Sequence, residues 1–160
     1  MSHNYDDILA RELGKITKEA AGPVADMFGA TVPPLELAGS LGAKMTMRFM
    51  PTECCAEILA VRADQVTVLT KCIMAIQDLG TMLDEPSESS FPTLSVVVRS
   101  GFLNMNPAVV HIEVVDVQES ACKLQVSAAA KEGLIKQNTA RKAVCQVVDR
   151  LRHRLPIEGR

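Results

Sequence analysis

His111 and Glu113 are the two side chains whose types and spacing come closest to a site for chemistry. They stand two residues apart in a valine-rich segment, and on a β-strand this spacing places both side chains on one face. An imidazole beside a carboxylate can hold a metal ion, move a proton or hydrogen bond to a ligand. Such a pair also occurs as an ordinary polar pair on the surface of a sheet. The ordinary polar pair is much the more common of the two, so we expect no metal site here.

The five cysteines offer a second kind of chemistry, either metal binding or nucleophilic attack. They form no Cys-x-x-Cys pattern, and Cys54 and Cys55 are adjacent, so a strand would direct them to opposite faces. Cys145 comes closest to a nucleophile because a helix would place it beside Arg141 and Arg152, and cations lower the pKa of a thiol. We nevertheless interpret it as a half-buried helix residue. The remaining two thiols are predicted in the core (Cys72 and Cys122).

Catalytic sequence motifs are also missing from the chain. Residues 39–44 (GSLGAK) contain two glycines and a lysine but lack the Gly-Lys-Ser/Thr ending of a phosphate-binding loop. There is no Gly-x-Ser-x-Gly nucleophile motif and no Gly-x-Gly-x-x-Gly dinucleotide motif. We therefore expect a non-catalytic protein without a cofactor.

The charges are distributed unevenly along the chain. Residues 131–160 hold eight basic and three acidic residues, a net of +5, whereas residues 1–130 hold nine basic and sixteen acidic residues, a net of −7. The basic residues of the last segment would spread over the whole solvent-facing side of a helix, and cations near its end also suit the helix dipole. Aromatic residues, which stack on bases, make up only 3% of the chain. We do not expect a nucleic-acid partner.

Two predicted loops carry apolar residues. One contains Phe102, Leu103 and Met105, and the other contains Leu134 and Ile135. Exposed apolar side chains often mark a surface that binds a partner or a ligand, and methionine suits an adaptable one. The alternative is that these residues fold back and close the ends of the core. We take these five residues as the candidate partner-binding surface.

The spacing of apolar residues predicts three helices, over residues 6–20, 65–79 and 138–155. The first should be broken at Gly22-Pro23, and a short turn over residues 24–28 can resume helical geometry after the break. The second should be capped by Asp64 and closed by Gly80 in the left-handed conformation. Apolar residues fill about half of the circumference of this second helix, so we expect it to be covered on two sides.

Six strands are predicted, over residues 45–49, 55–61, 81–84, 93–99, 108–117 and 121–129. Most are joined by short turns, which favours antiparallel pairing, and the apolar faces of the helices must be buried against the sheet. We therefore predict an α+β fold, a two-layer sandwich with an antiparallel sheet of about five to six strands, two helices packed on it and an extra N-terminal helix. Residues 1–42 would form the N-terminal helix and a linker, and residues 43–160 the α+β domain.

The predicted order of helices and strands is similar in outline to small dimeric modules such as bacterial roadblock-type domains and secretion chaperones. Residues 53–155 resemble in outline the arrangement of helices on a sheet in the TATA-binding protein. These resemblances imply a binding module and, for the first two groups, a dimer.

We expect a non-catalytic binding or adapter domain that acts through protein–protein contacts, as a homodimer that can also meet another protein partner. The alternative is a small-molecule-binding domain or a small enzyme, with a site between the sheet and the N-terminal segment where Arg99, His111 and Glu113 supply polar groups. The chain opens with no secretory signal and has no apolar stretch long enough for a transmembrane segment, so we expect a cytoplasmic protein.

Overall fold

The computed structural model describes residues 5–28, 50–83, 92–100, 106–132 and 136–157, with the backbone alone described for residues 17–28 and for Ser100. The predicted strand at residues 45–49 lies outside these ranges. Along the chain the elements are α1 (Tyr5–Phe28), β1 (Thr52–Val61), α3 (Gln65–Ile76), β2 (Gly80–Leu83), β3 (Thr93–Ser100), β4 (Asn106–Gln118), β5 (Ala121–Lys131) and α4 (Thr139–Arg152).

The strands form one open antiparallel sheet in the order β1-β5-β4-β3-β2. Every neighbouring pair is antiparallel, and the β4–β5 pair is closed by a short turn at Glu119 and Ser120. Together with the helices, this confirms the predicted α+β sandwich, with five strands in the described part of the chain.

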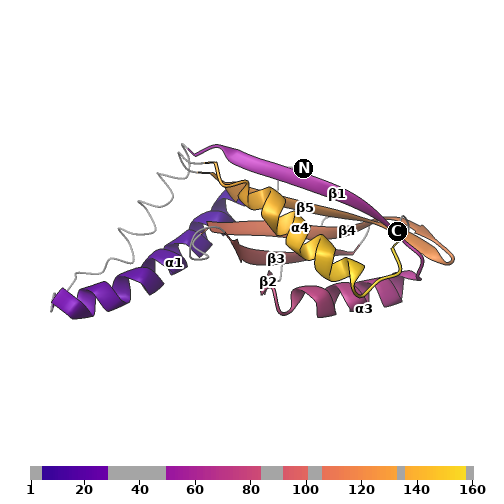
Figure 1. Ribbon diagram of the computed structural model, residues 1–160, viewed down its shortest axis with the longest axis horizontal. Helices are drawn as coiled ribbons and strands as arrows, with labels where there is room; N and C mark the ends of the chain where they lie inside the picture. The colour runs from indigo at the N-terminus through magenta and orange to yellow at the C-terminus, as the bar shows by residue number, and fades with distance from the viewer. Residues whose placement is uncertain (1–4, 29–49, 84–91, 101–105, 133–135, 158–160) are drawn as a thin grey trace.

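One face of the sheet carries the main hydrophobic core, which α3 and α4 cover (Figure 1). Alternate residues of the three inner strands point to this face and are small and aliphatic, as in Val96, Val110 and Val126, all fully buried. Burying such a side chain stabilises the fold by roughly 1.5–3 kcal/mol. The core therefore needs no aromatic residue. α4 contributes Ala140, Ala143, Val144, Val147, Val148 and Leu151.

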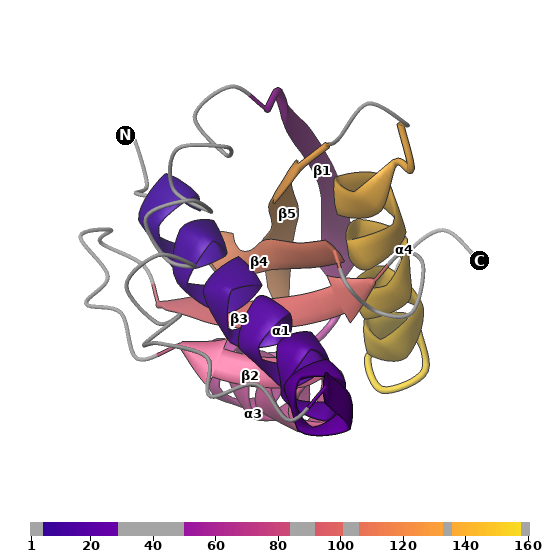
Figure 2. The same ribbon diagram turned by 90° about the vertical axis from the view of Figure 1, so that its left-hand side faces the viewer.

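α1 packs on the opposite face of the sheet (Figure 2). Its Leu9 is fully buried in a smaller core with Val97 of β3 and Val109 of β4. In the first turn of α1, Asp6 forms an ion pair with the buried Lys131 of β5, with 2.8 Å between Oδ1 and Nζ. The N-terminal half of α1 is therefore held to the sheet by both apolar and charged contacts.

α1 continues through Gly22 and Pro23 to Phe28, so the predicted break at this pair is wrong. A proline inside a helix removes one backbone hydrogen bond and costs about 3 kcal/mol. The lost hydrogen bond affects only one turn of the helix, however, and residues that favour helices stand on both sides of Gly22 and Pro23. The helix therefore resumes without an intervening turn.

α3 begins as predicted, with Asp64 as its N-cap. The carboxylate accepts hydrogen bonds from the N–H of Thr67 at 3.0 Å and from its hydroxyl at 2.6 Å. The hydrogen bond from the Thr67 hydroxyl lowers the pKa of Asp64 most, and the bond from the Thr67 backbone N–H lowers it further. The sequence pattern therefore located this end of the helix correctly.

The other end of α3 differs from the prediction. The helix stops at Ile76, and its C-cap is Gln77 in the right-handed conformation. Gly80 is instead the first residue of β2, where a Cβ atom would collide with the backbone carbonyl of Val97. The glycine is therefore needed for the close approach of two strands, and not for a left-handed turn.

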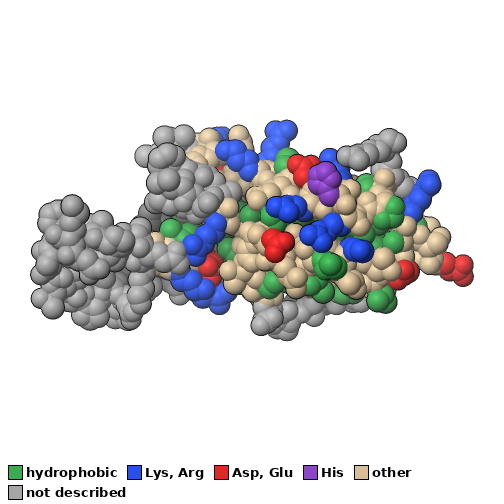
Figure 3. Space-filling view, turned by 60° about the horizontal axis from the view of Figure 1, so that its bottom comes forward, with side chains coloured by type: hydrophobic (Ala, Val, Ile, Leu, Met, Phe, Trp, Pro, Cys, Tyr) green, Lys and Arg blue, Asp and Glu red, His purple; other side chains and the backbone are tan. Residues whose placement is uncertain are grey.

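α3 is buried on one face only, so the prediction that it is covered on two sides is wrong. Val66, Ile73 and Met74 are exposed on its outer side, whereas its buried residues are Val68, Cys72, Ala75 and Ile76. The apolar arc of the helix is wider than the surface that the sheet and α4 cover. In Figure 3, hydrophobic side chains on the side of the molecule with α3 and α4 lie at the surface among lysines and arginines.

Candidate functional site

β1 forms one edge of the sheet. Its ten residues pair with β5 along their whole length, from Thr52 with Lys131 to Val61 with Cys122, and no bulge interrupts the register. β2 at the opposite edge has only four residues. Among the described strands, β1 is therefore the one that presents a long row of backbone groups at an edge.

Hydrogen bonds at the two ends of β1 determine which of its backbone groups point outward. On the open side, the N–H of Arg62 donates to the carbonyl of Pro156; on the β5 side, the N–H of Glu132 donates to the carbonyl of Pro51, both at 3.0 Å. Backbone groups of successive residues in an antiparallel strand point alternately to its two sides. The outward N–H and C=O groups therefore belong to the even-numbered residues Thr52, Cys54, Ala56, Ile58 and Ala60.

β1 lacks the features that commonly protect an edge strand, which are proline, outward-pointing charges, bulges and short length. The side chains of its even-numbered residues are uncharged, and that of Ile58 is 63% exposed. Its two carboxylates point to the other face, toward α4. There, Glu53 accepts a hydrogen bond from the N–H of Ala140, and Glu57 accepts one from Arg152, both at 2.9 Å. Among the described residues, only the C-terminal segment pairs with this edge, at Val61, so residues 52–58 offer their outward backbone groups to another strand.

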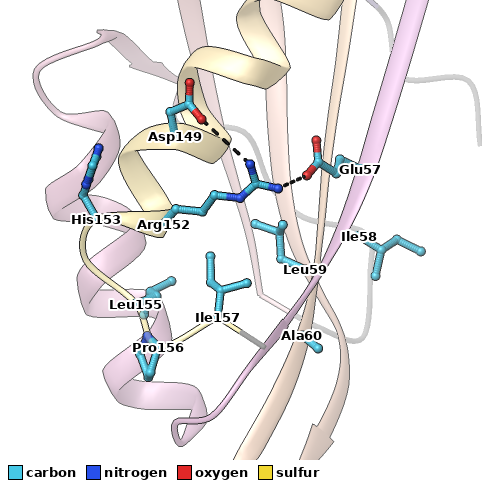
Figure 4. Close-up of a pocket in the computed structure, with 10 residues that line it drawn as sticks. All are labelled: Glu57, Ile58, Leu59, Ala60, Asp149, Arg152, His153, Leu155, Pro156 and Ile157. Atoms are coloured by element: carbon cyan, nitrogen blue, oxygen red, sulfur yellow. Dashed lines mark hydrogen bonds and ion pairs between the residues drawn. The ribbon is translucent and has the colours of Figure 1, made fainter. Parts of the chain in front are cut away.

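A groove of about 590 Å³ lies beside β1, where the C-terminal segment meets the strand (Figure 4). Leu59, Leu155 and Ile157 point into it and make its apolar part. Ile157 also pairs with Val61, so the C-terminal segment occupies the last position of the β1 edge. The groove is therefore continuous with the open part of that edge.

Arg152 forms the polar side of the groove. Its guanidinium lies 2.9 Å from the carboxylate of Glu57 and 3.9 Å from that of Asp149 (Figure 4). Arg152 and Asp149 are both largely exposed, and a pair of this kind contributes about 0.2–1 kcal/mol. The arginine is therefore held in position but is available to solvent and to a ligand.

A second carboxylate, Glu132, fixes the start of α4 close to the start of β1. It accepts hydrogen bonds from the N–H groups of Gln137 at 2.6 Å and Thr139 at 2.7 Å, beside the bond from Ala140 to Glu53. Burial raises the pKa of Glu132, but these backbone bonds more than offset it, so its pKa lies below its ordinary value. The carboxylates of Glu53 in β1 and of Glu132, directly after β5, thus take the place of a side-chain cap on the helix.

The three polar residues of the alternative site do not form one cluster. His111 is buried under α1, with Nδ1 2.7 Å from the hydroxyl of Ser95 and its ring 5.3 Å from that of Tyr5. Arg99 and Glu113 stand at opposite ends of the β3–β4 pair, about 20 Å apart along the strands. The structure brings His111 and Glu113 to nearby positions on one face and separates both from Arg99.

The candidate partner-binding residues Phe102, Leu103, Met105, Leu134 and Ile135 all lie outside the described residues. Their role as a partner surface stays a prediction.

The cysteines are all free. Cys72 and Cys122 are buried, as predicted, and burial raises the pKa of Cys72 to about 12. Cys145 is exposed on α4, where a half-buried position was predicted. Within the described ranges, no three His, Cys, Asp or Glu side chains are placed to hold a metal ion, and no helix is long and apolar enough to cross a membrane.

The open edge is a feature that the sequence analysis did not single out. A sequence pattern locates strands but does not give their order in the sheet, so β1 could not be assigned to an edge. One signal was present: residues 52–61 alternate between small or uncharged residues at even positions and charged or large residues at most odd positions.

Comparison with known proteins gives little beyond these observations. No protein-family model matches the chain, and no curated protein sequence matches it. Among solved structures, a truncated norcoclaurine synthase from Thalictrum flavum has a TM-score of 0.39 and 10% identity, covering 64% of this chain and 92% of that one. A point mutant of the Thalictrum flavum enzyme, bound to a transition-state analogue, has a TM-score of 0.30 and 13% identity, covering 65% and 97%. Both TM-scores are below 0.5, too low to indicate a shared fold.

Proposed function

We propose that this chain is a protein-binding domain that receives an extended strand of a partner on the open edge of β1. The observation that carries the proposal is the row of outward N–H and C=O groups on four uncharged residues of an unbulged edge strand, Thr52, Cys54, Ala56 and Ile58. An added strand pairs its main chain with such a row, and this pairing supplies affinity for many sequences.

The surroundings of the edge support selection among partner strands. Side chains of a strand alternate between its two faces, so a strand paired with β1 places every second side chain on the side of α4. There it meets the groove, whose apolar part comes from Leu59, Leu155 and Ile157 and whose polar side comes from Arg152. We infer that the groove favours a partner strand with an apolar side chain at that position.

A substitution at Ala56 tests this function without disturbing the sheet. Its N–H points outward, so Ala56→Pro removes a donor for the partner strand and leaves the bonds to β5 in place, as edge-strand prolines do. Ala56→Gly is the matched control because it keeps the N–H. Each protein is applied to an immobilised library of strand-forming peptides as long as the open edge.

We expect a subset of peptides to bind the wild type and Ala56→Gly and to bind Ala56→Pro at least about tenfold more weakly, the equivalent of about 1.4 kcal/mol. Circular dichroism confirms that each variant is folded. If no peptide distinguishes Ala56→Pro from Ala56→Gly, strand addition at β1 is wrong.

A small-molecule ligand is the second candidate, and the groove beside β1 favours it. Its volume of about 590 Å³ is within the range of small-molecule sites. Such a ligand would place an apolar body over Leu155 and Ile157 and an anionic group near Arg152. If a ligand still binds Ala56→Pro but no longer binds a folded Leu155→Ala variant, the small-molecule function is favoured over strand addition.

A further inference from the structure

We propose that the outer surface of α3 and α4 binds the surface of an anionic lipid bilayer. This inference goes beyond the proposed function, because that surface includes neither the β1 edge nor the groove beside it. We call it the helical face, and its residues are all exposed: Val66, Ile73 and Met74 of α3, Arg141, Lys142 and Arg150 of α4, and Arg154 in the turn after α4.

The basic side chains of the helical face have no acidic partners. Arg141, Lys142, Arg150 and Arg154 form no ion pair with a described carboxylate. The neighbouring Arg152 differs, because it is paired with Glu57 at 2.9 Å. Positive charges without partners repel one another and attract an anionic surface. The helical face therefore favours a negatively charged partner.

The cations spread over the whole outward side of α4, which runs between β1 and α3 (Figure 1). Arg141 stands about three turns before Arg152, which contacts β1, so Arg141 lies on the side toward β1. Arg150 stands about two and a half turns after Arg141 and lies on the opposite side, toward α3. A partner helix packs through a stripe of roughly 100° and would not meet both, whereas long basic side chains can turn their charged ends to one plane. The breadth of the charge favours a bilayer.

α3 supplies the apolar part of the helical face. Its exposed side chains are all uncharged, namely Val66, Thr67, Thr70, Ile73 and Met74. The exposed fractions of the three apolar ones are 73%, 37% and 43%. The outer side of a helix in water normally carries charged residues, whereas an element that lies on a bilayer combines apolar residues with lysines and arginines. Figure 3 shows hydrophobic and basic side chains next to one another on this side of the molecule.

The charge of the rest of the chain supports the same orientation. Residues 1–130 have a net charge of −7, whereas residues 131–160 have a net charge of +5. A negative surface attracts the second group and repels the first, so it turns the helical face toward itself. α1, on the opposite face of the sheet, then points away from the bilayer.

Co-sedimentation of the full chain with lipid vesicles tests the proposal. We expect the chain to bind vesicles of phosphatidylcholine mixed with phosphatidylserine and not vesicles of phosphatidylcholine alone. Replacing phosphatidylserine by phosphatidylglycerol, which has the same charge, should leave the affinity unchanged. In about 1 M salt, where the Debye length is only about 3 Å, most of the bound chain should be released.

Two double variants test the cations. Each cation near an anionic membrane strengthens binding about fivefold, so Arg150→Gln with Arg154→Gln should weaken binding about 25-fold. Arg141→Gln with Lys142→Gln should weaken it by a similar factor, because a bilayer meets both ends of α4. Circular dichroism confirms that both variants are folded.

The matched control removes two charges from the opposite face of the sheet, in Arg11→Gln with Lys123→Gln. Arg11 is exposed on α1, and its partner Glu12 keeps Lys15 at 2.7 Å. Lys123 precedes Leu124, which is part of the main core, so Lys123 points to the side of α1. We expect the affinity of this control to change by less than about twofold, because salt screens distant charges.

A further double variant tests the apolar part at constant charge. Ile73→Ser with Met74→Ser should weaken vesicle binding at least about threefold, because less apolar surface leaves water. Ile73→Leu with Met74→Leu is the matched control and should bind as the wild type does. Equal affinities for the serine and leucine variants overturn the helical face as the binding surface.

The remaining outcomes also decide the proposal. Failure to bind phosphatidylserine vesicles, equal binding to phosphatidylcholine alone, or an equal loss in the Arg11 and Lys123 control overturns it. Binding to soluble polyglutamate without binding to vesicles assigns the helical face to an acidic protein and likewise overturns the bilayer. The peptide library reports on β1 independently, so either proposal can fail while the other stands.

Discussion

Glu132 should stabilise the attachment of α4 to the sheet, and Glu132→Ala tests this. Its carboxylate accepts hydrogen bonds from the N–H groups of Gln137 and Thr139 at 2.6 and 2.7 Å. A hydrogen bond to a charged group contributes about 1.5–3 kcal/mol, and a buried donor left without an acceptor costs about 1–3 kcal/mol. Water can replace the acceptor at the half-buried Gln137 but not at the fully buried Thr139. We therefore expect the free energy of unfolding to fall by about 2–4 kcal/mol.

Urea unfolding followed by circular dichroism at neutral pH measures this loss of free energy. In thermal unfolding, the Tm should fall by about 4–16 °C. Glu119→Ala is the control because Glu119 is exposed in the turn between β4 and β5, and it should change stability by less than about 0.5 kcal/mol. If the two variants lose the same small amount, the carboxylate of Glu132 does not hold α4.

The pH dependence gives a second readout for the same side chain. The pKa of Glu132 is lowered in the folded chain, so its ionised form stabilises the fold above the unfolded pKa. This stabilisation is lost as the pH falls through the folded pKa. Below about pH 4.5 the wild type should therefore lose stability more steeply than Glu132→Gln, which has no charge to lose. Equal slopes for the two proteins would contradict this explanation.

Three further predictions concern packing. Gly80→Ala should lower the free energy of unfolding by about 1–3 kcal/mol, because the new Cβ atom meets the carbonyl of Val97, and an unchanged urea midpoint would be inconsistent with that contact. Leu124→Ala should lower the free energy of unfolding by about 2–5 kcal/mol, since Leu124 of β5 is fully buried in the main core. A loss below about 1 kcal/mol would show that this core is loosely packed. With a thiol reagent at pH 8, the exposed Cys145 should react in the native protein, whereas the buried Cys72, with a pKa of about 12, should react only after unfolding. Mass spectrometry measures the labelling of each residue, and rapid labelling of Cys72 in the native protein would contradict its burial.

The fold could be predicted well because its elements have strong local signals. Valine-rich alternation located β3, β4 and β5, and Asp64 marked the start of α3. Gly80 was misassigned because a glycine after a helix has the same sequence signature whether it ends the helix or lets two strands approach. Only the paired strand, with the carbonyl of Val97 next to Gly80, distinguishes the two cases.

The candidate site was much harder to predict from sequence. Which side of β1 is open depends on the order of the strands, and this order is set by contacts distant in sequence, such as Glu53 with Ala140 and Val61 with Ile157. Arg99, His111 and Glu113 were predicted as site residues because side chains of these types can bind a ligand. Of these, His111 proved to be buried beneath α1, and Arg99 lies far from Glu113.

Residue-resolved hydrogen exchange is the most direct test of the central claim that the even-numbered backbone groups of β1 point outward and pair with another strand. In the chain without a bound peptide, the N–H groups of Cys54 and Ile58 should exchange rapidly, while those of Cys55 and Leu59, which point to β5, exchange slowly. When a peptide selected from the library is bound, the N–H groups of Cys54 and Ile58 should also become protected. Equal protection of odd and even residues in the free chain, or rapid exchange of Cys54 and Ile58 in the peptide complex, would contradict the account.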